Sequence, residues 1–117
     1  MNKDTNKLNS RIAEIVCTYG SEQMGIRPEK ISVDVHNQSV TVTLEGVSHP
    51  AELNLAKEQL SRSMIQKMYT ELFNVSKPVL HSRLEHILGR TVNRSFFTVD
   101  PQYGGAVIVL FLSGDLE

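Results

Sequence analysis

The sequence predicts an α+β fold in which helices pack against an antiparallel four-stranded sheet. Apolar residues return every three or four positions between residues 50 and 88, which is the period of a helix with one buried face. Two short segments before this stretch and two after it are rich in β-branched residues and are separated by turn residues, as in hairpins. Helices segregated from antiparallel hairpins are typical of α+β domains. The expected order is helix, strand, strand, long or kinked helix, strand, strand.

Length and composition indicate one globular domain. The 117 residues suffice for one hydrophobic core but not for two, so residues 1–117 are expected to form a single domain. The net charge is −1, whereas nucleic-acid-binding proteins carry a basic excess, so no nucleic-acid partner is expected. No apolar run reaches the ~20 residues of a membrane span, and the N-terminus lacks the apolar core of a signal peptide. A single cysteine, Cys17, fits a reducing compartment, and we expect it to be half-buried and inert. The chain is therefore expected to be cytoplasmic, with no direct membrane insertion.

The first helix is expected to begin near Asp4 or Thr5, whose side chains can cap exposed N–H groups. Gly20 can end it, or one further turn can continue it to Gly25. Its apolar residues fall on one face, at offsets of four, seven, eight and eleven: Leu8, Ile12, Ile15, Val16 and Tyr19.

A β-hairpin follows and is the clearest local signal. Apolar and polar residues alternate on both sides of Asn37-Gln38, which can form a two-residue turn. The turn length and the alternation agree on one register, which places all the apolar residues on one face. This register pairs Ile31 with Leu44, Val33 with Val42 and Val35 with Val40.

The long helix is expected to begin at Pro50, with Glu52 completing a capping box. Pro78 lacks the N–H of a helical hydrogen bond, so we expect a break or a kink at about Lys77. If its apolar stripe faces the core, Leu60→Ala should cost about 2–5 kcal/mol of stability. The stripe comprises Leu53, Ala56, Leu60, Met64, Met68, Leu72 and Val75, and resumes with Leu80, Leu84, Ile87 and Leu88.

Gly89 is expected to end the helix, and two strands follow at residues 91–99 and 106–112. The last strand is apolar at every position, so both of its faces are expected to be covered. One face can meet the helices, and the other needs the first helix or a second subunit. This strand predicts a homodimer.

The motifs of catalysis and metal binding are missing. His81 and Glu85 are four residues apart, and we expect a surface contact between them rather than half of a metal site. No serine or cysteine sits in the strained turn of an activated nucleophile, and no glycine-rich loop leads into a helix as in phosphate sites. We expect no catalytic residue, no metal and no cofactor.

Basic residues gather modestly at two places. Arg27 and Lys30 precede the first strand, and Arg62 and Lys67 lie on the long helix. Either pair is a candidate surface for a small ligand or an anion, although scattered exposed cations are the simpler interpretation.

Several stretches together resemble the bacterial MpsC-like family, which is named for the third component of a proposed Na+-translocating, membrane-potential-generating system. The resemblance covers nearly the whole chain and rests on the order and spacing of short motifs. They are Met24-Gly25-Ile26-Arg27-Pro28, Leu44-Glu45-Gly46-Val47-Ser48-His49-Pro50-Ala51-Glu52 with Leu55-Ala56, Lys77-Pro78 with Leu80, Gly89 with Val92, and Val109-Leu110-Phe111-Leu112 before Asp115-Leu116-Glu117.

The chain departs from the family pattern at three places. Ile26 stands where the family usually has arginine, His49 stands where a threonine would cap the helix, and Tyr69 aligns with a common arginine. The resemblance implies an accessory role beside a cation or inorganic-carbon transport system, with no recognised catalytic residues. The first hypothesis is therefore a small accessory or regulatory protein that acts by protein–protein contact, and the alternative is a ligand- or anion-binding module. An enzyme is the third hypothesis.

Overall fold

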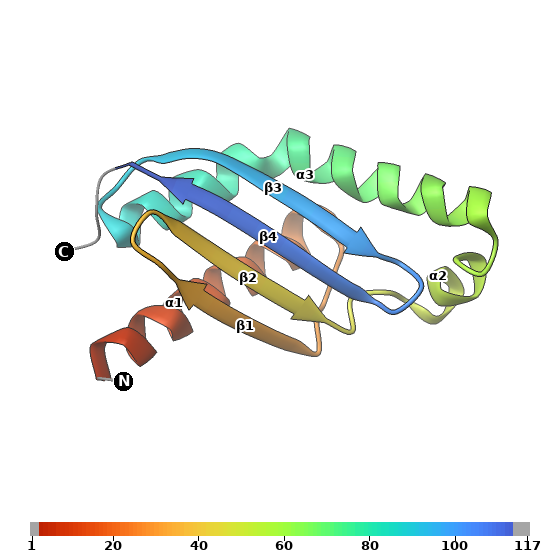
Figure 1. The fold of residues 1–117 in the computed structure, drawn as a ribbon, viewed down its shortest axis with the longest axis horizontal. Coiled ribbons are helices and arrows are strands. Elements are labelled where there is room, and N and C mark those ends of the chain that lie inside the picture. Colours follow the sequence, from red (N-terminus) through yellow and green to blue (C-terminus); the bar gives the residue numbers. More distant parts are fainter. Residues whose placement is uncertain (1–2, 114–117) are drawn as a thin grey trace.

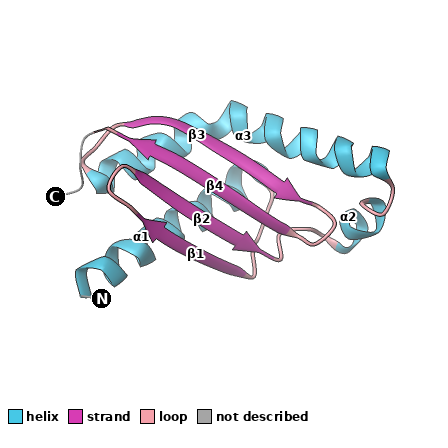
Figure 2. Ribbon diagram, in the orientation of Figure 1, coloured by secondary structure: helices cyan, strands magenta, loops and turns pink. Residues whose placement is uncertain are grey.

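The computed structural model of the chain describes residues 3–113 and has two layers, a sheet and the helices behind it (Figure 1). The sheet is antiparallel, in the order β1-β2-β4-β3. Figure 2 shows that the helices all lie on the same side of the sheet. The α+β prediction is confirmed. The elements are α1 (Lys3–Tyr19), η1 (Gly20–Met24), β1 (Lys30–Val35), β2 (Ser39–Glu45), α2 (Pro50–Leu55), α3 (Gln59–Leu88), β3 (Val92–Asp100) and β4 (Gly105–Leu112).

The hairpin of β1 and β2 has the predicted register. Val33 faces Val42 and Val35 faces Val40, and the His36 N–H closes the turn by donating to the Ser39 carbonyl at 2.8 Å. Because side chains alternate between the two faces of a strand, this register sends the apolar side chains of both strands toward the helices.

The first helix has the further turn that the sequence allowed. α1 continues into η1, one turn of π-helix, and Gly25 ends it with a positive φ of 68°. Glycine suits this place because a Cβ there would be strained. Cys17 is exposed on α1, so the expectation of a half-buried thiol was wrong.

The long helical stretch breaks at residues 56–58 and not at Pro78. Pro50 begins α2 as predicted, and the His49 N–H donates to the Glu52 Oε1 atom at 2.9 Å. α3 then runs unbroken from Gln59 to Leu88 with Pro78 inside it, and Gly89 ends it as expected. A helix of this length spans about 45 Å, close to the 46 Å long dimension of the described chain. The helix is bowed in Figure 1, as a proline inside a helix allows.

The face that α3 buries differs from the predicted one. Ala56, Leu80 and Leu84 are buried as expected, and Ile87 and Leu88 are half-buried. The other stripe residues are exposed: Leu53, Leu60, Met64, Met68, Leu72 and Val75. A second row faces the sheet instead and comprises Ile65, Tyr69, Phe73, Ser76, Leu80 and Leu84. This row contains the two aromatic rings of the helix, which bury more apolar area than the aliphatic residues of the other row.

Only one face of β4 is covered by helices. Ala106, Ile108, Leu110 and Leu112 are buried, whereas Val107, Val109 and Phe111 are half-buried on the face opposite the helices. The expectation that both faces are covered was therefore wrong for the single chain, because α1 lies on the same side as α3 (Figure 2).

Two leucines of α3 provide a matched test of this orientation. Leu80→Ala should lower the free energy of unfolding by about 2–5 kcal/mol, because Leu80 is completely buried. Leu60→Ala should change it by less than about 0.5 kcal/mol, since 75% of Leu60 is exposed. Urea denaturation in dilute solution, where self-association contributes least, measures both. Equal losses in the two variants would contradict the assigned face.

Candidate functional site

An exposed apolar row follows one flank of α3, about 100° around the helix from the residues that face the sheet. We call it the α3 row: Leu60, Met64, Met68, Leu72 and Val75. Its exposed fractions reach 75% at Leu60, 64% at Met64 and 83% at Val75. Soluble monomers often expose single apolar residues, but a continuous apolar patch usually marks a contact with another molecule.

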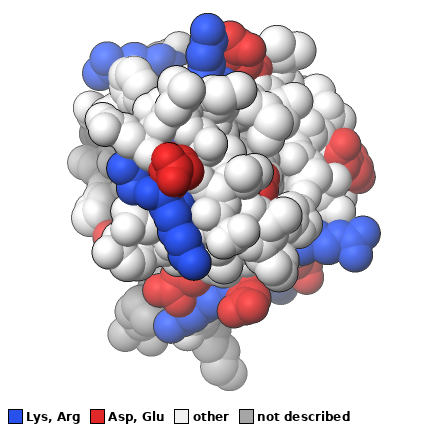
Figure 3. All heavy atoms as spheres, turned by 90° about the vertical axis from the view of Figure 1, so that its right-hand side faces the viewer, with Lys and Arg blue, Asp and Glu red and all other residues white. Residues whose placement is uncertain are grey.

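The apolar surface continues around the end of the molecule that holds α2. Leu53 and Leu55 are exposed on α2, and Tyr103 is exposed in the loop between β3 and β4. Figure 3 views this end and shows a broad area without Lys, Arg, Asp or Glu, beside a basic and an acidic side chain left of its centre. Leu55 also lines a hollow with Met64 and Met68, so the exposed apolar residues of α2 and α3 meet there.

Two shallow hollows flank the middle of the α3 row. One, of about 420 Å³, is lined by Leu55, Met64 and Met68 among others. The second, of about 350 Å³, is lined by Met68, Leu72 and Val75 on its apolar side and by Gln23, Glu71 and Ser76 on its polar side. Met68 borders both hollows, and methionine adapts its shape readily to a partner surface.

Two exposed charges border the row. Lys67 and Glu71 directly precede Met68 and Leu72, so they lie about 100° around the helix from these residues. Neither charge makes an ion pair or a hydrogen bond with another residue of the described part of the chain. The row therefore has the buried face of α3 on one side and one unpaired charge of each sign on the other.

The sequence suggested two alternative anion sites, Arg27 with Lys30 or Arg62 with Lys67, and the structure places the two pairs on different elements. Arg27 lies in the loop after η1, and Lys30 begins β1 opposite Glu45. Arg62 and Lys67 are both on α3 but are about 140° apart around it. Lys67 is thus the one candidate that borders the α3 row.

Arg62 has a structural contact. Its guanidinium donates to the Ala56 carbonyl at 3.1 Å and to the Gln102 side chain at 3.0 Å. Arg62 therefore joins the start of α3 to the residue after α2 and to the loop after β3. It positions the end of the molecule from which the α3 row begins.

Tyr69 ties α3 to α2. Its hydroxyl donates to the Glu52 Oε2 atom at 2.7 Å, while the other oxygen of the same carboxylate accepts the His49 N–H. Burial, together with the hydrogen bond to Glu52 and its negative charge, raises the pKa of Tyr69 well above its usual value of 10.0. The tyrosine is therefore neutral at physiological pH and acts as a donor. Spacing along the sequence did not reveal this pair, because 17 residues and a helix break separate its members.

His81 and Glu85 form no hydrogen bond or ion pair with each other, and each bonds to β3 instead, which corrects the expectation of a surface pair. The His81 Nε2 atom lies 2.6 Å from the Ser95 Oγ atom, and Glu85 accepts the N–H of Val92 at 2.7 Å. Both side chains therefore hold α3 to β3. Burial lowers the pKa of His81, Lys77 lowers it further, and Glu85 opposes this shift. No group of three or more His, Cys, Asp or Glu residues suited to a metal occurs in the described part of the chain.

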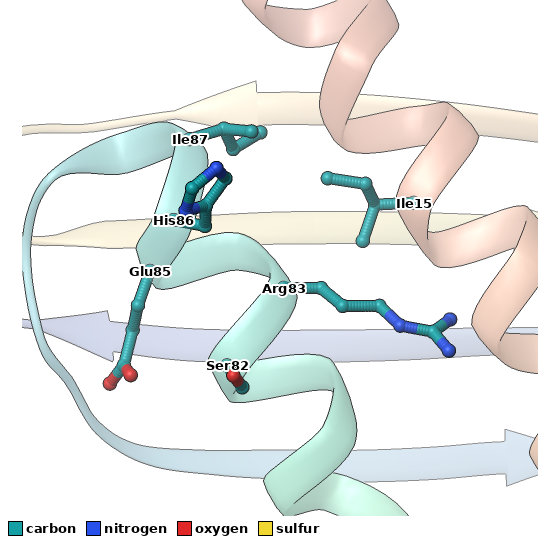
Figure 4. A pocket seen from close by; sticks show the side chains of 6 residues that line it. All are labelled: Ile15, Ser82, Arg83, Glu85, His86 and Ile87. Atoms are coloured by element: carbon teal, nitrogen blue, oxygen red, sulfur yellow. The ribbon is translucent and has the colours of Figure 1, made fainter.

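An open groove of about 650 Å³ lies between α1 and the end of α3 (Figure 4). Ile15 of α1 faces His86 and Ile87 of α3 across it, and Arg83 extends toward α1. The Arg83 guanidinium pairs with the Glu22 carboxylate at 2.9 Å. This ion pair fastens η1 to α3, so the main cation of the groove is already engaged.

The face of the sheet opposite the helices has its own small apolar patch. Phe96 and Phe111 pack edge to face with ring centroids 5.9 Å apart. The Arg94 guanidinium lies 4.4 Å from the ring centroid of Phe111 and 5.7 Å from that of Phe96. Cation–π contacts of this kind place one positive charge at the centre of the patch.

The comparison with known families agrees with the sequence motifs. A family model described as "Na+-translocating membrane potential-generating system (MpsC)" matches residues 4–114 of the 117-residue chain. The chain belongs to the MpsC family. No curated protein and no solved structure matches it. Within residues 3–113, no helix of the chain is long and apolar enough to cross a membrane.

The three departures from the MpsC pattern occupy structural positions in this member. Ile26 is buried and packs against Gly20, where a Cβ would come within 3.0 Å of it. His49 occupies the N-cap of α2, and Tyr69 is buried against Glu52. Two of the three side chains therefore belong to the interior. The closing motif Asp115-Leu116-Glu117 lies outside the described residues.

Tyr69→Phe should destabilise the fold by about 1.5–3 kcal/mol, the range for a hydrogen bond to a charged group. The loss arises because the Glu52 carboxylate keeps its partly buried position and loses a donor. Urea denaturation measures it. Tyr103→Phe is the control, because Tyr103 is 79% exposed and should tolerate the change within about 0.5 kcal/mol.

His81→Gln should make the fold less sensitive to acid. The folded-state pKa of His81 lies below its ordinary value of 6.5, so the unfolded chain takes up the proton first as the pH falls. The wild type should therefore lose stability through this group below about pH 6.5, and the variant should not. Melting temperatures from about pH 7 to about pH 5 test this, and parallel losses in both proteins would contradict it.

Proposed function

We propose that this MpsC-family protein is a small cytoplasmic accessory or regulatory component that acts by protein–protein contact and forms a homodimer. The family description supports a place beside a cation-translocating membrane system, and an inorganic-carbon transport system is an alternative setting. The single cysteine, exposed on α1, supports a reducing compartment.

The exposed α3 row is the observation that carries this proposal. Four of its members directly precede a buried residue, so a single helix has two apolar rows and the sheet can bury only one of them. The second apolar row stays exposed to water, which lowers solubility and does not stabilise the fold of the single chain. Such a surface is best explained by a partner that covers it.

Several polar groups that could otherwise carry chemistry hold elements together, which supports a role without catalysis. His81 and Glu85 fasten α3 to β3, and Tyr69 and Glu52 fasten α3 to α2. Side chains committed to such contacts do not converge on a common space where a substrate could react.

The wild-type chain should have a solution mass near twice that of one chain at micromolar concentration, falling toward the monomer mass on dilution. The physical reason is the removal of the exposed apolar surface from water. Light scattering across a dilution series measures this mass. A monomer at every accessible concentration would contradict the homodimer.

A further inference from the structure

We infer that the α3 rows of two copies pack against each other, antiparallel, around a two-fold axis that passes near Met68. This inference rests on the proposed homodimer and assigns its contact surface. The occupant of the row is thus the α3 helix of a second copy of this chain.

The spacing of the row suits helix–helix packing. Leu60, Met64, Met68 and Leu72 are each four residues apart, so they form one continuous ridge of the kind that fits the groove of another helix. Two ridges of this kind cross at about −50°. An axis through Met68 places Met64 of one copy opposite Leu72 of the other, and the reverse, as a self-complementary interface requires.

The two charges beside the ridge select a second copy as the partner. The midpoint of Lys67 and Glu71 lies within one residue of Met68 along the helix. The same two-fold axis therefore brings Lys67 of each copy to Glu71 of the other. Each charge is unpaired within the described chain, and the second copy supplies both partners.

The hollows on either side of Met68 make the two α3 rows complementary in shape as well as in charge. In the antiparallel arrangement, Leu72 of the second copy meets the hollow bordered by Leu55 and Met64. Met64 of the second copy meets the hollow bordered by Leu72 and Val75. The protruding side chains of the row thus face the hollows of its own copy.

The sheet patch is the competing surface, and its charge argues against self-pairing. Arg94 lies against both Phe96 and Phe111 at the centre of that patch. A two-fold axis through this arginine would bring two positive charges together, and like charges brought together oppose association. The α3 row, with one charge of each sign, has no such conflict.

Two charge reversals test the pairing directly. Lys67→Glu alone should raise the dimer dissociation constant at least about tenfold, because each copy then brings glutamate to Glu71 of the other. Glu71→Lys alone should do the same through paired lysines. An equimolar mixture of the two variants should recover a heterodimer with affinity within about threefold of the wild type, since every pair is again of opposite sign.

Sedimentation velocity across a dilution series at low salt measures these constants, and circular dichroism checks that each variant folds. Phe96→Ser, on the sheet patch, is the matched control, because Phe96 is 55% exposed and should leave the dissociation constant unchanged.

The outcomes separate this inference from the proposed homodimer. If neither charge reversal weakens the wild-type dimer, the α3 pairing is overturned and the homodimer stands. If Phe96→Ser raises the dimer dissociation constant, the interface lies on the sheet. Weakening in both single variants without recovery in the mixture would overturn the antiparallel arrangement. A monomeric wild type would overturn the homodimer and the α3 pairing together.

Discussion

Phe73 fixes how α3 is rotated against the rest of the fold. Its ring is almost completely buried, packs edge to face against Tyr19 of α1 and stacks on Phe97 of β3 at 5.4 Å. The Tyr19 hydroxyl lies 2.6 Å from the Ser76 Oγ atom, one turn further along α3. Burial raises the pKa of Tyr19 and the Ser76 hydrogen bond lowers it, with burial the larger effect. Three elements thus meet at one aromatic cluster, and the orientation of α3 follows from it.

The exposed row is a direct consequence of that cluster. Turning α3 by about 100° would bury Leu72 in place of Phe73 and would lose both ring contacts. The fold therefore keeps its aromatic residues inside and leaves an aliphatic row outside. The contacts that stabilise the single chain thus also leave this row exposed.

The sequence predicted local pairings well and the rotation of α3 poorly, for a physical reason. The β1–β2 register follows from a period of two and a short turn, both of which are local. The two rows of α3 have the same helical period, and the choice between them depends on Tyr19 and Phe97, which are far away in the chain. The helix break had no proline or glycine to mark it, because residues 56–58 are Ala-Lys-Glu. For the candidate site, the sequence identified the residues of the α3 row as one apolar stripe and Lys67 as a candidate cation. It did not reveal that this stripe is exposed.

In a dimer joined through α3, the uncovered face of the sheet would be present twice. Arg94 and Phe96 lie on the face of the sheet opposite the helices, so pairing along the α3 row would leave them open to solvent in both copies. The proposed dimer would be bivalent, with two identical faces held at a fixed separation. A target with two matching sites would engage the second at high effective concentration, and a weak contact at each face would become a strong one overall.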